Sequence, residues 1–324
     1  MENKSQVRNG ALDVFRCACM FLIVLGHTYH YGVSPHTSWV LNALFSYLIC
    51  WHVDAFTALS GWFGIKTGFG KFMRIYGIVV FYSCLSIFVG RFFLGMNVPL
   101  RISGGWYGNT YLCLMLIAPL LNAGIDSLAQ RERKQLGLAW LGFAAVVWIN
   151  WFSGNSYVGF IAYDVAPFTL IQLAFVYITV RAIRKTELVN CIRLWHLIAM
   201  GVIFVCIAIA LPGPRLNYLA PHTIAMSVVM LVLFEKYLRF PNWMVRMSSW
   251  MAPSMFGIYL LHEVCCFGRS LFRFPLNALT GRGMPPFVAV ITSACFCFVA
   301  CLGVDILRRQ MLKWCTQFLR GRVK

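Results

Sequence analysis

The sequence predicts an all-α fold, a polytopic integral membrane bundle of about ten transmembrane helices that forms a single domain over residues 1–324. Of the 324 residues, 60% are hydrophobic and only 12% are charged. The mean hydropathy of +0.72 lies far outside the range of soluble domains. The chain also divides into apolar runs of about 16 to 22 residues, and a helix needs about 20 residues to cross the hydrocarbon of a bilayer.

The expected spans follow one another along the chain with short connections. Their ranges are 13–32, 40–64, 73–94, 109–125, 136–152, 165–180, 195–211, 221–238, 251–267 and 286–307. Pro and Gly mark turns at 99–108, 212–214 and 281–286. The first apolar run is followed by no small-residue cleavage site, so it is expected to be a retained span and not a signal peptide.

The distribution of positive charge predicts the orientation. Ten spans place both termini on one side, and that side receives 22 of the 28 Lys and Arg residues. The other side receives Arg91, Arg101, Arg215, Arg269, Arg273 and Arg282. The positive-inside rule therefore predicts a multi-pass protein of the plasma (inner) membrane with both termini in the cytoplasm.

Two classes of partner are not expected. The net charge of +18 is dispersed between apolar runs and forms no basic stripe with interleaved aromatics, so nucleic acid is not predicted. The thirteen Cys have no metal-type spacing and lie mostly inside apolar runs, as small packing residues do. Neither a metal site nor a disulfide framework is therefore predicted.

The last segment, 308–324, alternates basic and apolar positions. This pattern is typical of an amphipathic helix on a membrane surface, where cations meet lipid headgroups. We expect a basic cytoplasmic tail that contacts membrane lipids.

The first expected span is polar at both ends. The run LDVFRCACMFLIVLGH contains Asp13 and Arg16 near its start and ends at His27. Arg16 and His27 are eleven residues apart, so on a helix their directions differ by about 20° and their Cα atoms are about 16 Å apart. Asp13 precedes Arg16 by three residues and can pair with it, which lowers the cost of a guanidinium near hydrocarbon. This helix is expected to line a polar pathway.

Four further segments accompany this helix in a fixed order along the chain. They are VDAFTALSGWF at 53–63, KFMRIYGIVVFYS at 71–83, WYGNTYLCLMLIAPLLN at 106–122 and FGIYLLHE at 256–263. With the opening helix they cover about residues 10 to 310, and together they resemble the acyltransferase-3 family of membrane-bound acyltransferases. The resemblance is greatest to bacterial members that decorate extracytoplasmic polysaccharides.

The resemblance implies a reaction. A membrane O-acyltransferase, more specifically an O-acetyltransferase, would move an acyl group from cytoplasmic acyl-CoA, such as acetyl-CoA, to a sugar hydroxyl. The implied acceptor is an exopolysaccharide, another surface glycan or a lipid-linked saccharide. The hydroxyl needs a base, and an imidazole suits that role at neutral pH, so His27 is the candidate base. The alternative is a histidine that caps the helix at the interface.

Candidate donor-binding residues lie on the first three spans. Arg16, supported by Asp13, can bind a phosphate or the pantetheine end of CoA, or it can simply snorkel to the cytoplasm. Lys71 and Arg74 can bind CoA phosphates or can be ordinary positive-inside charges. Ser60 can donate to the substrate or to the developing oxyanion, or it can be a small-residue helix contact.

Candidate acceptor-binding residues lie on the later spans. Tyr259 and His262 are expected on one helix face, with Glu263 pointing about 100° away, and Arg269 follows two turns on if the helix continues. The alternative for this group is an interfacial aromatic belt. The resemblance to the family implies that Trp106 also belongs to the acceptor-binding residues. Asp54, with His52, is costly in lipid and is expected to line the same cavity.

A membrane transporter for a glycan or small molecule is the rival hypothesis, because the same charges would suit a permeation route. A transporter favours repeated halves with broken helices in corresponding places, and the sequence has no such pairing. A glycan polymerase or ligase would carry a large external loop, and none of the expected loops exceeds about twenty residues. Binding or hydrolysis of acetyl-CoA would separate the enzyme from the transporter.

Overall fold

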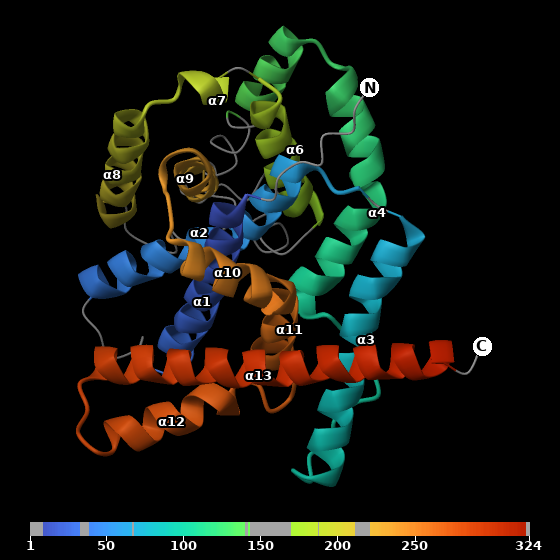
Figure 1. Ribbon diagram of the computed structural model, residues 1–324. Coiled ribbons are helices and arrows are strands. Elements are labelled where there is room, and N and C mark those ends of the chain that lie inside the picture. Colours follow the sequence, from blue (N-terminus) through green and yellow to red (C-terminus); the bar gives the residue numbers. More distant parts are fainter. Residues whose placement is uncertain are drawn as a thin grey trace, which may run out of the picture.

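The computed structural model describes residues 9–32, 39–66, 68–139, 142, 170–186, 188–210 and 221–321, and all regular structure within them is helical (Figure 1). The predicted all-α membrane helix bundle is therefore confirmed. The α-helices with defined bounds are α1 (Gly10–Gly32), α2 (Trp39–Phe63), α3 (Phe69–Phe92), α4 (Gly105–Ser127), α6 (Leu170–Arg184), α7 (Leu188–Cys191), α8 (Leu194–Ala210), α9 (Pro221–Val232), α10 (Asn242–Met251), α11 (Met255–Tyr259), α12 (Ser270–Thr280) and α13 (Pro286–Gly321).

Within the described residues, four helices are long and apolar enough to cross a membrane. They cover Gly10–Tyr31, Phe69–Phe92, Gly105–Ser127 and Pro286–Phe318, and they correspond to the first, third, fourth and tenth expected spans. Most of the fifth expected span, the start of the sixth and the turn at 212–214 lie outside the described residues. The number of ten spans therefore stays a prediction.

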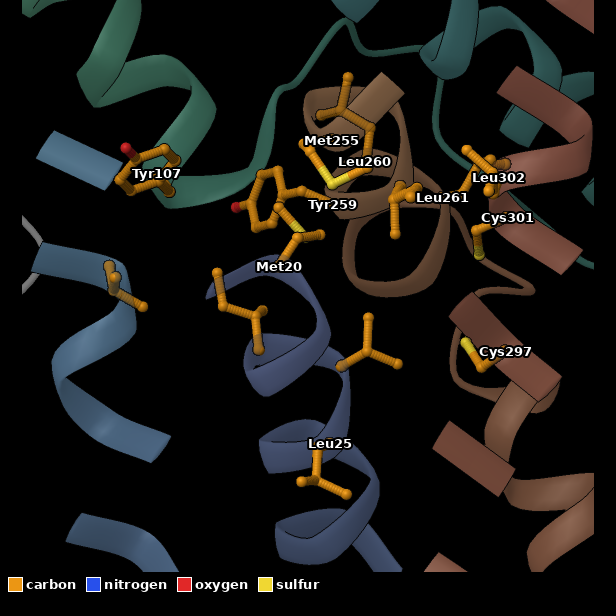
Figure 2. Close-up of a cluster of buried hydrophobic side chains, with 14 of the residues drawn as sticks. Met20, Leu25, Tyr107, Met255, Tyr259, Leu260, Leu261, Cys297, Cys301 and Leu302 are labelled. Carbon is orange, nitrogen blue, oxygen red and sulfur yellow. The ribbon is translucent and has the colours of Figure 1, made fainter. Parts of the chain in front are cut away.

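Helix α1 lies at the centre of the bundle and is far more buried than the other three long spans. It packs against α2, α10, α11, α12 and α13. One face of α1 joins a cluster with α2, in which Phe15 stacks on Trp51 with ring centroids 6.2 Å apart. Figure 2 shows the opposite cluster, where Met20 and Leu25 of α1 lie near side chains from α4, α11 and α13. Apolar packing on both sides thus fixes the position of α1.

The ninth expected span, 251–267, is not one continuous helix. A 3₁₀ turn (Ala252–Ser254) joins α10 to the short α11, and a π-helical turn (Leu260–Val264) follows it. The π turn is closed by a hydrogen bond from the Cys265 N–H to the Leu260 carbonyl, 2.9 Å long. Such turns are rare and are frequently found at functional sites.

Helix α12 was not predicted and packs against α13 in a hairpin (Figure 1). Its apolar side chains Phe272 and Leu276 are buried, while Phe274 on another face is exposed. A helix of 11 residues is too short to span a bilayer, so a search for apolar runs of spanning length passes over it. The predicted turn at 281–286 is confirmed, and Gly283 in it adopts φ +79°.

Helix α13 runs without interruption through 36 residues. The basic segment 308–324 is helical as far as Gly321, as expected, but it continues the preceding span in the same helix. At 1.5 Å per residue the helix is about 54 Å long.

Candidate active site

A cavity of about 270 Å³ follows α1 along the face that carries Arg16, Met20, Ile23 and His27. The first and last of these residues are eleven residues apart, so the cavity extends over roughly 16 Å of helix. The predicted common face of Arg16 and His27 is therefore confirmed. The remaining wall comes from α2, α3, α4 and the 252–259 segment, including Val53, Phe56, Ser60, Ile75, Trp106, Tyr107, Tyr111, Phe256 and Tyr259.

Asp13 holds the guanidinium at one end of this cavity. The Asp13 Oδ1 atom lies 3.5 Å from Arg16 Nη1, and the Ser249 hydroxyl donates to Asp13 Oδ2 across 2.8 Å. The Asp13 side chain is 6% exposed, whereas that of Arg16 is 34% exposed. The Asp13 carboxylate therefore interacts with Ser249 of α10 and with Arg16. Of Asp13 and Arg16, only the arginine lines the cavity.

Hydrogen bonding fixes the tautomers of two histidines at the other end. His262 Nδ1 lies 2.7 Å from the Ile258 carbonyl oxygen, which can only accept, so Nδ1 carries the proton. His262 Nε2 is therefore an acceptor. His27 Nδ1 lies 3.0 Å from this atom and must donate to it. The proton of neutral His27 is consequently on Nδ1, and its Nε2 carries a lone pair.

Glu263 adds a charge beside the same imidazole. Its Oε2 atom is 3.3 Å from His27 Nδ1, and its Oε1 atom is 3.4 Å from Arg269 Nη2. Arg269 also donates to the Tyr31 hydroxyl across 3.1 Å and stacks over that ring. The helical spacing predicts Glu263 about 100° away from the face of Tyr259 and His262. It nevertheless belongs to the same polar group, because the side chains of both His262 and Glu263 reach His27 Nδ1.

Trp106 and Tyr259 separate this cavity from a second one of about 440 Å³, because both residues line both cavities. Figure 2 shows the Tyr259 ring at the end of α11 beside Met20 of α1, on the side that faces Tyr107 of α4. The second cavity is bounded by the C-terminal half of α3, the connection to α4 and residues 263–266. Glu263 lines it while touching His27, which lines the first cavity.

The Ser60 hydroxyl lies on the cavity wall in a local hydrogen-bond pair. Its Oγ atom donates to the Phe56 carbonyl across 3.1 Å, so the Tyr111 hydroxyl, also 3.1 Å away, is the donor to Ser60. The Ser60 proton is thus directed along its own helix. A group bound in the cavity would compete for it.

The structure does not bring every predicted residue to the cavity. Lys71 and Arg74 are exposed in the first turns of α3, and only the next residue, Ile75, contributes to the wall. Asp54 is 1% exposed and accepts a hydrogen bond from Gln172 on α6, 3.0 Å long. The prediction that Asp54 and His52 line the cavity is wrong, because Val53 and Phe56 occupy that face of α2.

Sequence reasoning missed a buried charged group on α13. Asp305 is fully buried and its Oδ1 atom accepts from the Tyr82 hydroxyl at 2.7 Å and from Arg308 Nε at 2.8 Å. Gly257 of α11 lies directly against this carboxylate, where a Cβ atom would overlap it. The available signal was the Asp-x-x-Arg spacing inside an apolar run, which is the spacing of Asp13 and Arg16.

The comparisons with known proteins agree with this architecture. The profile of the family described as "Acyltransferase domain" (Acyl_transf_3) matches residues 9–307. No curated protein and no solved structure matches the chain. The matched region contains α1 to α12, the histidine pair and most of α13. The chain therefore belongs to the acyltransferase-3 family of membrane acyltransferases.

Proposed function

We propose that the protein is an O-acyltransferase, specifically an O-acetyltransferase, that moves an acyl group from acyl-CoA to a sugar hydroxyl of a surface or lipid-linked glycan. The observation that carries this proposal is the His27 imidazole. Its Nδ1 proton is engaged by His262, and the ring lies on a cavity that extends to a guanidinium. A base and an anion-binding group thus share one elongated chamber.

The proposed orientation follows from the charge distribution. Arg16 would lie toward the cytoplasm of the plasma membrane and His27 toward the external face, with both termini in the cytoplasm. This arrangement supports delivery of the donor from the Arg16 end. The acceptor would approach from the His27 end.

The size and lining of the first cavity suit the thioester arm of acetyl-CoA. A volume of about 270 Å³ is at the lower limit of small-molecule pockets, so the nucleotide part would remain outside. Mostly apolar walls would hold the pantetheine chain, and Arg16 would bind an anionic or polar group along it. The exposed Lys71 and Arg74 would then contact the phosphates outside the cavity.

The proposed chemistry is direct transfer. His27 Nε2 takes the proton of the acceptor hydroxyl while the oxygen attacks the thioester carbonyl. The tetrahedral intermediate then expels the CoA thiolate, and the imidazolium returns its proton to the sulfur. During this step Nδ1 keeps its bond to His262, and the Glu263 carboxylate stabilises the positive imidazolium. No metal takes part in the proposed reaction.

The test is a His27→Gln variant in purified, lipid-reconstituted protein. Release of CoA from acetyl-CoA, with and without glycan from the producing cell envelope, should be lost, with a drop of about 10²- to 10⁴-fold expected for removal of a general base. His30→Gln is the matched control, because His30 lies on α1 but outside the cavity lining.

Two results would overturn the proposal. One is normal glycan acetylation by a folded His27→Gln variant. The other is glycan uptake into proteoliposomes without consumption of acetyl-CoA, which would favour the transporter.

A further inference from the structure

We propose that the second cavity is the acceptor subsite and that it selects a saccharide bearing an anionic group, which Arg101 binds. The inference rests on the proposed acyl-transfer function and specifies its acceptor. The cavity has a volume of about 440 Å³ and shares the Trp106 and Tyr259 wall with the chamber that contains His27. A ligand seated there has the Trp106 and Tyr259 side chains between it and the chamber of the base, and it lies against Glu263, which contacts His27.

The wall of this cavity combines polar and apolar side chains, and hydrogen bonds hold its segments together. The Ser103 N–H donates to Ser83 Oγ across 3.1 Å, which ties the connection between α3 and α4 to α3. The Cys266 N–H donates to Ser86 Oγ across 2.9 Å, which ties the segment after the π turn to the same helix. These contacts form a preorganised pocket for a hydroxylated ligand.

Arg101 provides the charge that the pocket offers to a ligand. Arg101 and Glu263 are the two formally charged residues among those that line it. Glu263 is already balanced by Arg269, and Arg91 nearby donates twice to the Val98 carbonyl, at 2.8 and 2.7 Å. Within the described part of the chain, Arg101 is exposed and has no side-chain hydrogen bond or ion pair.

A guanidinium with open donors recognises a carboxylate or phosphate by two parallel hydrogen bonds. The neighbouring chamber offers mostly apolar side chains and the paired Arg16, so it suits the thioester arm and not a charged sugar. The contrast between the two chambers therefore assigns the donor to one and an anionic saccharide to the other.

Cys266 gives a direct readout of this cavity, because it lines the pocket and is only partly buried. The full-length protein in nanodiscs is treated with an anionic (sulfonatoethyl) or a cationic (trimethylammonioethyl) methanethiosulfonate, and modification of Cys266 is followed by peptide mass spectrometry. Each rate is divided by the rate of the same reagent with a small free thiol, because a thiolate attacks a cationic reagent faster than an anionic one. On this relative scale we expect the anionic reagent to react about tenfold faster, as a local positive field raises the concentration of anions. Arg101→Gln should abolish the preference.

Arg282→Gln is the matched control, since Arg282 lies in the α12–α13 turn and does not line the pocket. It should retain the preference of the natural protein. Equal rates for the two reagents in the natural protein, or a preference that survives in Arg101→Gln, would overturn the charge assignment.

Saccharide selectivity is tested by protection of Cys266. A glucuronosyl-glucose disaccharide should slow the labelling more than the disaccharide with its carboxyl group reduced to an alcohol. Equal protection by both, or protection by neither, contradicts the proposed acceptor class. Because labelling requires no turnover, these results are separate from the CoA-release assay of His27→Gln. If the cavity is charge-selective but the protein does not consume acetyl-CoA, the acyl-transfer function is rejected and the charge selectivity of the cavity is retained.

Discussion

His27 and His262 are 235 residues apart in the chain, yet their ring nitrogens Nδ1 and Nε2 lie 3.0 Å from each other. The Ile258 carbonyl sets the direction of this hydrogen bond, because it obliges His262 to present an unprotonated Nε2. The proton acceptor of the proposed reaction is therefore oriented by the π turn at the end of α11.

His262→Leu should lower kcat by roughly 10²-fold, since His27 then loses the acceptor that fixes its tautomer. His262→Gln can present a side-chain carbonyl in its place and should recover part of the rate. The kcat of each variant is measured by CoA release from acetyl-CoA in nanodiscs. An unchanged kcat in a folded His262→Leu variant would show that the histidine pair does not orient the base.

Asp13→Asn should weaken the binding of acetyl-CoA, because Arg16 loses the carboxylate that holds it at the cavity. Loss of an ion pair with a partly exposed arginine corresponds to up to about 1 kcal/mol, which is a several-fold change in the dissociation constant. Ser249→Ala removes only the hydroxyl that donates to Asp13 and should have a smaller effect. Isothermal titration with acetyl-CoA gives the dissociation constants, and equal affinity in Asp13→Asn and the natural protein would contradict the role assigned to this pair.

Gly257→Ala should destabilise the protein by about 1–3 kcal/mol, as overpacking of a well-filled interior does. The added Cβ atom overlaps the Asp305 carboxylate, which is fixed on both sides by Tyr82 and Arg308. Gly303→Ala is the control, since a Cβ atom at that position of α13 meets open space. The readout is the Tm in detergent, and equal Tm values for the two variants would argue against this tight contact.

Asp305→Asn should also destabilise the fold, by about 3–5 kcal/mol, because it leaves Arg308 as an uncompensated buried charge. The double variant with Arg308→Gln removes both charges and should regain much of the lost stability. Unfolding of the single and double variants in detergent forms a complete cycle. Additive losses in the double variant would mean that the two residues do not interact as a pair.

The sequence predicts those features of the site that depend on local periodicity. Arg16 and His27 lie on one helix, so their common face follows from their spacing alone. The contact of His27 with His262 and Glu263 depends on packing between distant segments and on a π turn that no residue pattern announces. Spacing along the chain therefore identifies the residues of the site but not the contacts between His27, His262 and Glu263.

Asp54 illustrates a different limit. A carboxylate in an apolar span is expected to face a polar cavity, but both sides of α2 pack against other helices. Periodicity cannot decide between two buried faces, and Asp54 turns toward Gln172 of α6. One of the two partners of Asp305, Tyr82, lies 223 residues away on α3, so this contact does not follow from the sequence, whereas the pairing with Arg308 three residues on does.

The length of α13 has a consequence for how the protein responds to its bilayer. A helix of about 54 Å exceeds a hydrocarbon layer of about 30 Å, and the excess is accommodated by tilt or by emergence into water. Figure 1 shows α13 crossing the direction of α3, so the two helices do not both lie along the membrane normal. We therefore expect a thinner or thicker membrane to change the inclination of α13 or the length that emerges from it. Asp305 of α13 is hydrogen-bonded to Tyr82 on the wall of the second cavity, so we expect a change in inclination to reach that wall.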